Sequence, residues 1–163
     1  MAVPSYSLPP LLSLFASAAG NDPQWQTELR AFFGHYYVQG HWYAYPGRGH
    51  KLLSVDFEES DFDHVCFKEP NPTTTARTQW RTDRAERLLW VGFTLENPDQ
   101  TRWLKPSNRY VLVRNTGDTA LPVYVVVLDL IHQDHFDFIT AYPGDGKKQR
   151  SLRLEGVSVR VQP

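Results

Sequence analysis

Residues 122–143 read PVYVVVLDLIHQDHFDFITAYP, and the rest of the chain is interpreted around them. Val123–Ile131 is apolar on both faces with one interruption, and such a strand belongs in the middle of a sheet. The polar run His132–His135 predicts a turn. The alternation of Phe136–Tyr142, ended by Pro143, predicts a second arm. The stretch is therefore typical of one central β-hairpin.

The second arm carries two hydroxyl groups, on Thr140 and Tyr142. A spacing of two residues predicts that both lie on the same strand face as Phe136 and Phe138. That face is either part of the core or the floor of a binding site. Thr and Tyr also favour strands for packing reasons alone, so the spacing leaves both interpretations open.

Composition indicates one folded domain spanning residues 1–163, with 41% hydrophobic and 21% charged residues. The net charge of -1 excludes a molecule that attracts nucleic acid over its whole surface. An acidic run at 56–63 contrasts with basic runs at 77–87 and 147–160, where a polyanion could bind locally. The alternative for each run is a solvated surface. The single cysteine, Cys66, excludes an intramolecular disulfide.

Three parts of the chain differ in character. Residues 1–50 are expected to form a helical and aromatic N-terminal segment, with helices over Leu11–Gly20 and Trp25–Tyr36. The first of these is read as a short helix rather than a signal peptide, and no stretch is long and apolar enough to span a membrane. Residues 51–143 are expected to form the core, and 144–163 a basic C-terminal segment.

Within the core, short apolar and alternating stretches predict further strands, and one periodic stretch predicts a helix. The helix is expected over 80–92, with Thr82 or Asp83 as its cap and Asn97 and Pro98 as its stop. Strands are expected at 52–57, 101–104, 109–115 and 157–161, and Gly40–Gly49 is expected to form a short strand followed by a turn. The fold class predicted is α+β, with N-terminal helices packed on a small twisted antiparallel sheet.

Histidines are the natural candidates for proton transfer, because imidazole titrates near neutral pH. His64 lies between apolar residues, so it is either a core residue or a catalytic acid or base. The irregular spacing of His35, His41 and His50 does not predict a zinc site. We expect no metal and no cofactor.

The order of these features resembles a superfamily of ribonucleases. His64 is followed by an Arg-rich helix ending in LLWVGFTLENP, by a strand with Arg109 and Tyr110, and by a hairpin ending in ITAYP. This order is similar to that of the barnase, EndoU, colicin and RelE superfamily, especially its phage-associated and polymorphic-toxin members. The resemblance covers roughly Lys51–Pro143. It implies a compact antiparallel sheet preceded by helices.

The resemblance also implies metal-independent RNA cleavage, in which the 2′-hydroxyl attacks the adjacent phosphate. His64 would be the acid or base, and Arg109 or Arg114 would hold the phosphate. Only one of the two arginines could share the site, because a spacing of five residues places them on opposite faces. Thr140 would bind the scissile phosphate, and Tyr142 would stack on a base or orient the phosphate.

Further roles are implied for residues outside this set. Arg81 and Arg84 would follow the RNA backbone, and His135 would be a second proton-transfer candidate. RNA, tRNA included, is the expected partner, together with a cognate immunity or antitoxin protein and no membrane. The expected location is the cytoplasm, of the producing cell or of a target cell. The alternatives are a non-catalytic module that binds RNA or protein, and a purely structural role for Thr140 and Tyr142.

Overall fold

In this computed structural model the described residues, 23–47, 51–68, 79–154 and 157–159, form a mixed α/β fold. The predicted helix at 11–20 lies outside these residues. The main sheet is built from β1 (Trp42–Ala44), β2 (Leu53–Asp56), β5 (Gln100–Leu104), β6 (Arg109–Asn115), β7 (Val123–Ile131), β8 (His135–Gly144) and β9 (Val157–Val159). A separate two-stranded ladder pairs β3 (Phe67–Lys68) with β4 (Gln79–Trp80).

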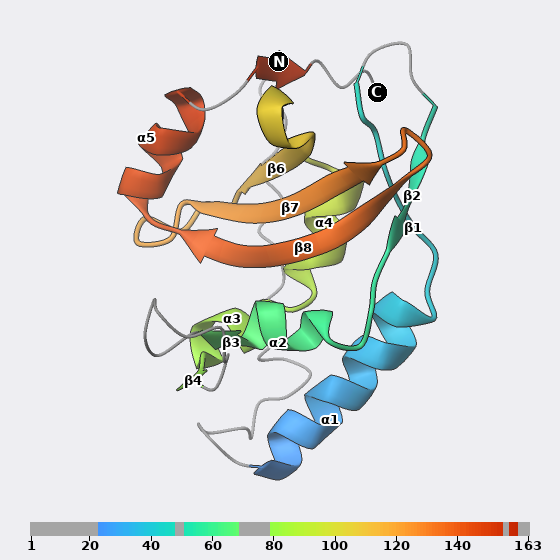
Figure 1. The fold of residues 1–163 in the computed structure, drawn as a ribbon. Coiled ribbons are helices and arrows are strands. Elements are labelled where there is room, and N and C mark those ends of the chain that lie inside the picture. The colour runs from blue at the N-terminus through green and yellow to red at the C-terminus, as the bar shows by residue number, and fades with distance from the viewer. Residues whose placement is uncertain (1–22, 48–50, 69–78, 155–156, 160–163) are drawn as a thin grey trace.

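Five α-helices surround the sheet in the described part of the chain, together with a π-helix at Gly34–Val38 and a 3₁₀ turn at Lys105–Ser107. They are α1 (Pro23–Phe33), α2 (Asp61–Cys66), α3 (Thr82–Ala85), α4 (Trp90–Glu96) and α5 (Gly146–Leu154). Figure 1 shows α4 behind the β7–β8 hairpin and α5 at the end where β8 stops.

The hairpin is central, as the sequence predicts. The strand order is β1-β2-β8-β7-β6-β5-β9, so β7 has three strands on each side. All described pairs in this sheet are antiparallel except β2 with β8, which run parallel over two residue pairs. The expectation of a wholly antiparallel sheet is therefore wrong at this one junction.

Each face of the sheet carries its own apolar cluster. The larger cluster joins β6, β7 and β8 to α1, α2 and α4, and its fully buried side chains include Leu29, Phe62, Val91, Tyr124 and Phe136. The smaller cluster lies on the other face, where Leu152 of α5 packs with Val111, Val113, Val123, Val125 and Val127. Both faces of β7 are thus buried, which explains its continuous apolar sequence.

A β-bulge changes which residues of β8 face the core. Val127 pairs with Thr140, whereas the next residue, Leu128, pairs with Phe138, so Ile139 is the extra residue. An extra residue reverses the alternation of side chains beyond it. Phe138 therefore belongs to the larger cluster, but Tyr142 packs with the smaller one on the opposite face. The prediction that Thr140 and Tyr142 share a face with Phe138 is wrong for this reason, because they pair with Val127 and Val125 of the smaller cluster.

The helix predicted over 80–92 is two short helices. Trp80 belongs to β4, and α3 and α4 are joined by turns at 86–89. In these turns the backbone N–H groups of Arg87 and Leu88 bond to carbonyls three residues earlier, not four. The tighter turns shift the helical phase, so one continuous period does not describe the segment.

Candidate functional site

His64 and Thr140, both predicted for the site, are in contact where α2 meets β8. The Thr140 hydroxyl donates a hydrogen bond to the His64 carbonyl oxygen at 3.0 Å, and His64 Nδ1 lies 2.9 Å from the carbonyl oxygen of Ile139. A carbonyl oxygen only accepts, so Nδ1 carries the proton in this bond. An uncharged imidazole that has its proton on Nδ1 carries its lone pair on Nε2, which is the form required of a general base.

The helix α2 can contact β8 here because β2 pairs with β8 over only two residues. Asp56 and Asp137 form the last of the two residue pairs between these strands. Beyond that point the backbone polar groups on this edge of β8 need other partners. His64 supplies one for the carbonyl of Ile139, so α2 takes the place of a strand. The imidazole is positioned by the sheet, not by a loop.

Asp61 is a buried carboxyl one helical turn before His64. Its residue is 6% exposed, and its Oδ2 accepts a hydrogen bond from the Glu58 backbone N–H at 2.8 Å. Burial raises the pKa of Asp61 from 3.8 to about 6, although the Glu58 N–H and the charge of His64 act in the opposite direction. The sequence places Asp61 only in an acidic run. Its raised pKa follows from burial, which the sequence does not reveal.

Tyr142 lies beneath two cationic groups. The Arg84 guanidinium carbon is 5.7 Å from the ring centroid, and the Lys148 ammonium nitrogen is 5.8 Å from it. Arg84 comes from α3, whose Ala85 packs in the larger cluster, and Lys148 comes from α5, whose Leu152 packs in the smaller one. Helices on both faces of the sheet therefore bring positive charge to the end of β8.

The other predicted arginines make local contacts. Arg81 forms two hydrogen bonds with the Asp83 carboxylate, at 2.9 and 3.0 Å. Arg114 donates to the Asn97 carbonyl oxygen at 2.6 Å, which fastens β6 to the end of α4. The structure does not bring these two side chains into the His64 and Thr140 contact.

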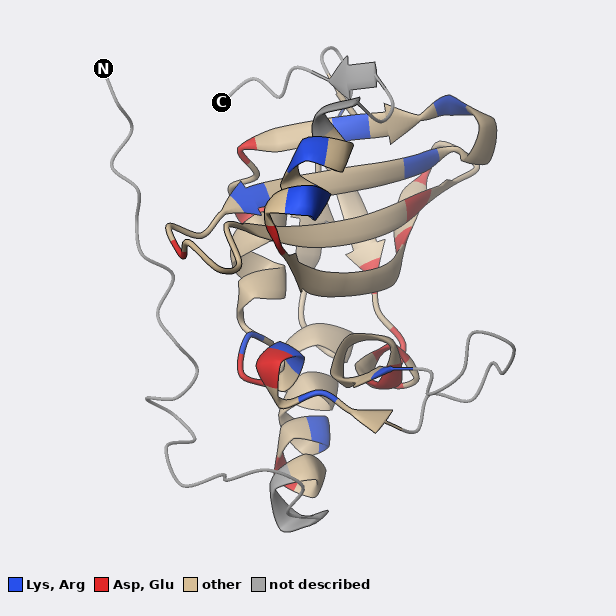
Figure 2. Cartoon of the chain, turned by 90° about the vertical axis from the view of Figure 1, so that its left-hand side faces the viewer, with Lys and Arg blue, Asp and Glu red and all other residues tan. Residues whose placement is uncertain are grey.

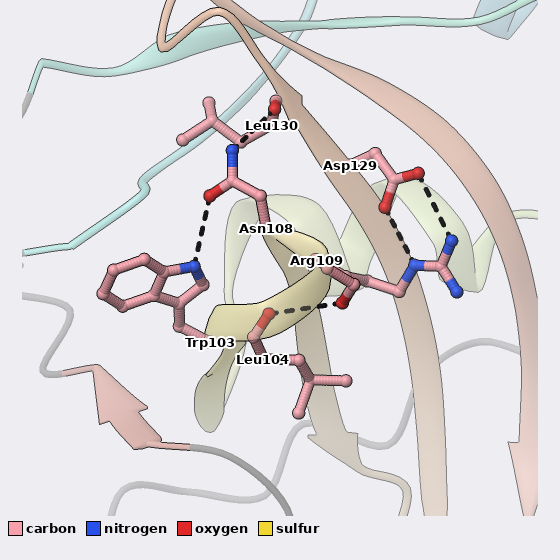
Figure 3. Close-up of polar contacts among 7 residues, drawn as sticks. Trp103, Leu104, Asn108, Arg109, Asp129 and Leu130 are labelled. Atoms are coloured by element: carbon pink, nitrogen blue, oxygen red, sulfur yellow. Dashed lines mark hydrogen bonds and ion pairs between the residues drawn. The ribbon is translucent and has the colours of Figure 1, made fainter.

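Arg109 is also held by a carboxylate. Its Nε lies 2.8 Å and its Nη2 3.3 Å from the two oxygens of Asp129 on the neighbouring strand (Figure 3). This hydrogen-bonded carboxylate raises the pKa of the Arg109 guanidinium. Arg109 and Asp129 are directly opposite in the sheet, whereas Thr140 is opposite Val127, so Arg109 belongs to a different part of the surface.

His135 lies among carboxylates rather than beside His64. Its Nε2 is 3.3 Å from Asp137 Oδ1 and 3.7 Å from Asp56 Oδ2. Four of the predicted residues thus lie along the C-terminal half of β8: His64, Thr140, Tyr142 and Arg84. His135 lies at the beginning of this strand, and Arg81, Arg109 and Arg114 make the separate contacts described above.

Lys148 was not predicted for the site because the sequence interpretation assigns no helix to its segment. A signal was present, however. Asp145 Oδ1 accepts a hydrogen bond from the Lys148 backbone N–H at 2.9 Å, which is the N-cap arrangement favoured by Asp. Figure 2 shows Lys and Arg residues, in blue, along the helix that follows.

Comparisons with known proteins add no relative. Neither a family model, nor a curated protein, nor a solved structure matches this chain. Among the helices that the structure describes, none combines the length and apolar character needed to cross a membrane.

Proposed function

We propose that this protein is an endoribonuclease that cleaves RNA without a metal ion, at the junction of α2, α3 and β8. The observation that carries the proposal is that β8 is contacted by an imidazole, at the carbonyl of Ile139, and three residues later carries an aromatic ring with two cations near it. His64 provides the imidazole, Tyr142 the ring, and Arg84 and Lys148 the cations. A base, a stacking surface and positive charge are what RNA transesterification requires.

The reaction follows from these groups. His64 Nε2 accepts the proton of the 2′-hydroxyl, whose oxygen attacks phosphorus. The bond from phosphorus to the 5′-oxygen breaks, and the products are a 2′,3′-cyclic phosphate and a 5′-hydroxyl. The departing 5′-oxygen takes a proton from the Tyr142 phenol, which is regenerated by proton exchange with solvent. Arg84 and Lys148 stabilise the additional negative charge on the phosphate oxygens as the new bond forms.

Thr140 acts as a positioning residue in this proposal. A hydroxyl has one proton to donate, and that of Thr140 is used by the His64 carbonyl. Its contribution is to hold α2, and with it the imidazole, against β8. This replaces the direct phosphate contact implied by the family resemblance.

The resemblance to the barnase, EndoU, colicin and RelE superfamily remains part of the proposal. It supports RNA, tRNA included, as the substrate and the cytoplasm as the place of action. A toxin-type nuclease also requires a cognate inhibitory protein in the cell that makes it.

The test is cleavage of total RNA and of tRNA by the purified chain in EDTA, with His64→Asn as the central variant. The Asn amide nitrogen occupies the place of Nδ1, so it preserves the hydrogen bond to the Ile139 carbonyl while removing the base. We expect a 2′,3′-cyclic phosphate product, and a loss of about 10²- to 10⁴-fold in rate for His64→Asn. His35→Asn, on the N-terminal π-helix, is the matched control and should retain full activity.

A binding measurement tests the contacts between the cations and RNA independently of cleavage. Lys148→Gln should reduce the salt dependence of single-stranded RNA binding by about 0.7 in the slope of log K against log salt, the value for one phosphate contact. Lys147→Gln removes the same charge from the neighbouring, exposed residue and should have a smaller effect.

Two results would contradict the proposal. Wild-type cleavage unchanged in His64→Asn would show that the base lies elsewhere. RNA that is bound but never cleaved, at any protein concentration, would favour the non-catalytic binding module.

A further inference from the structure

Three metal-ligating side chains converge on the surface at the beginning of β8, away from the proposed nuclease site. His135 Nε2 lies 3.3 Å from Asp137 Oδ1 and 3.7 Å from Asp56 Oδ2, and one ligand atom from each residue lies within 4.8 Å of the other two. The imidazole is the least exposed of the three side chains, at 28%, against 50% for Asp137 and 61% for Asp56.

The sheet itself fixes this convergence. Asp56 of β2 is in register with Asp137 of β8, and His135 precedes Asp137 by two residues, so all three side chains lie on one face. The neighbouring pair, Val55 and Phe136, points into the core and is almost fully buried. The arrangement therefore does not depend on a loop conformation.

A second feature of this face favours a bound cation. Asp129, Asp137 and Asp56 are in register on three adjacent strands, which places three carboxylates side by side. Like charges directly opposite one another destabilise a sheet. At one end of this row, Arg109 balances the negative charge of Asp129 by pairing with it through two nitrogens (Figure 3). Toward the other end of the row, His135 Nε2 lies 3.3 Å from Asp137 Oδ1 and 3.7 Å from Asp56 Oδ2.

We propose that Asp56, His135 and Asp137 bind one divalent transition-metal ion, with Zn²⁺ as the best fit. One nitrogen and two carboxylate oxygens form a ligand set typical of such ions. Zinc bonds of about 2.0–2.2 Å in tetrahedral geometry place neighbouring ligand atoms about 3.3–3.6 Å apart, close to the two distances observed here. Three protein ligands leave a fourth position for water.

The imidazole also has a carboxylate on its other side. Asp134 Oδ2 lies 3.6 Å from His135 Nδ1. Zinc-bound histidines usually direct their second nitrogen at a carboxylate or carbonyl, which orients the ring. A movement of a few tenths of an ångström would bring this pair to hydrogen-bonding distance.

The role of the ion follows from the elements that it joins. β2 and β8 share only two residue pairs, yet this pairing attaches the β1–β2 hairpin to the rest of the sheet. An ion ligated from both strands acts as a clip across that short junction. The proposal concerns stability and is independent of the proposed nuclease activity.

The test is thermal unfolding of the untagged full chain, stripped with EDTA and exchanged into metal-free buffer at pH 7.5. ZnCl₂, MnCl₂ and MgCl₂ are added separately, and zinc stoichiometry is measured by calorimetric titration. We expect one zinc per chain and a rise in Tm of about 5–10 °C at a zinc concentration of about 100 times Kd. Magnesium should have little effect, because it prefers oxygen ligands in octahedral geometry.

Conservative variants locate the ion. Asp137→Asn and His135→Gln should each abolish most of the zinc-dependent rise in Tm while retaining the wild-type circular dichroism spectrum. Glu59→Gln removes the same charge from an exposed residue of the acidic run and should keep the full rise. No rise with any of the three metals, or an equal rise in the wild type and both ligand variants, would overturn the proposal.

Discussion

Replacing the buried Asp61 carboxyl by an amide should stabilise the protein at neutral pH and not at acid pH. The pKa of Asp61 rises from 3.8 to about 6 in the folded state, chiefly because the carboxyl is buried. The unfolded chain therefore loses this proton at a lower pH than the folded protein. Below about pH 3.8 both states hold the proton, and the contribution of Asp61 to stability is fully present. As pH rises through 6, that contribution is lost.

The size of the effect follows from the shift. Two pKa units correspond to about 3 kcal/mol, so wild-type stability should fall by about 0.5 kcal/mol by pH 4 and by about 3 kcal/mol by pH 7.5 on account of this group alone. Asn does not titrate, and its side-chain oxygen still accepts the hydrogen bond from the Glu58 N–H. The stability of Asp61→Asn relative to wild type should therefore increase with pH by the same amounts.

Urea unfolding at pH 4.0, 5.0, 6.0 and 7.5, at constant ionic strength and in EDTA, measures this difference. Asp63→Asn on the same helix is the control. Asp63 is partly exposed, and its carboxylate pairs with Arg30 at 2.6 Å. The loss of this exposed ion pair should lower the free energy of unfolding by only about 0–1 kcal/mol. A difference for Asp61→Asn that does not vary with pH, or one that is negative at pH 7.5, would refute the reasoning.

Three further substitutions test the packing around α4. Tyr37→Phe should cost about 1–3 kcal/mol, because the buried hydroxyl donates to the Leu88 carbonyl at 2.7 Å and accepts from the Gly92 N–H at 3.2 Å. Tyr124→Phe should be neutral or stabilising, because that hydroxyl is buried with no hydrogen-bond partner among the described residues. Gly92→Ala should lower Tm by several degrees, because a Cβ would meet the Trp42 ring at 2.6 Å. Equal effects of the two Tyr→Phe changes in urea unfolding, or an unchanged Tm for Gly92→Ala, would contradict this account.

The central hairpin was predictable because its signal is local. Continuous apolar character over Val123–Ile131 required burial on both faces, and the structure confirms it. The bulge at Ile139 was not predictable in the same way. A bulge depends on which residue of one strand pairs with which residue of the other, and no alternation within β8 alone carries that information.

Among the helices, too, one was predictable from local sequence and another was not. The helix α1 was predictable from apolar residues at three- and four-residue spacing, and the structure confirms it over Pro23–Phe33. The helix α5 was missed because Leu152 is its buried apolar residue among those whose side chains are described, so it shows little periodicity. Its capping residue, Asp145, was the better signal.

Sequence reasoning could name the residues of the candidate site but not group them. The contact between His64 and Thr140 joins residues 76 positions apart, and it depends on β2 leaving the edge of β8. The same limit applies to the cluster of Asp56, His135 and Asp137, because strand register alone brings the first of these to the other two. The sequence indicates which chemical group each residue carries, whereas the pairing of the strands decides which residues lie close together.

The two proposed sites use opposite ends of β8 and opposite charges. Asp137 and Tyr142 are five residues apart on this strand, which corresponds to about 16 Å of extended chain. That separation is about twice the distance over which salt at physiological concentration screens exposed charges. Under the nuclease proposal, the carboxylates near Asp137, when no ion is bound to them, would repel an RNA strand from one end of β8 without cancelling the cations at Tyr142. RNA should consequently approach over α3 and α5, and the metal proposal and the nuclease proposal can each fail without affecting the other.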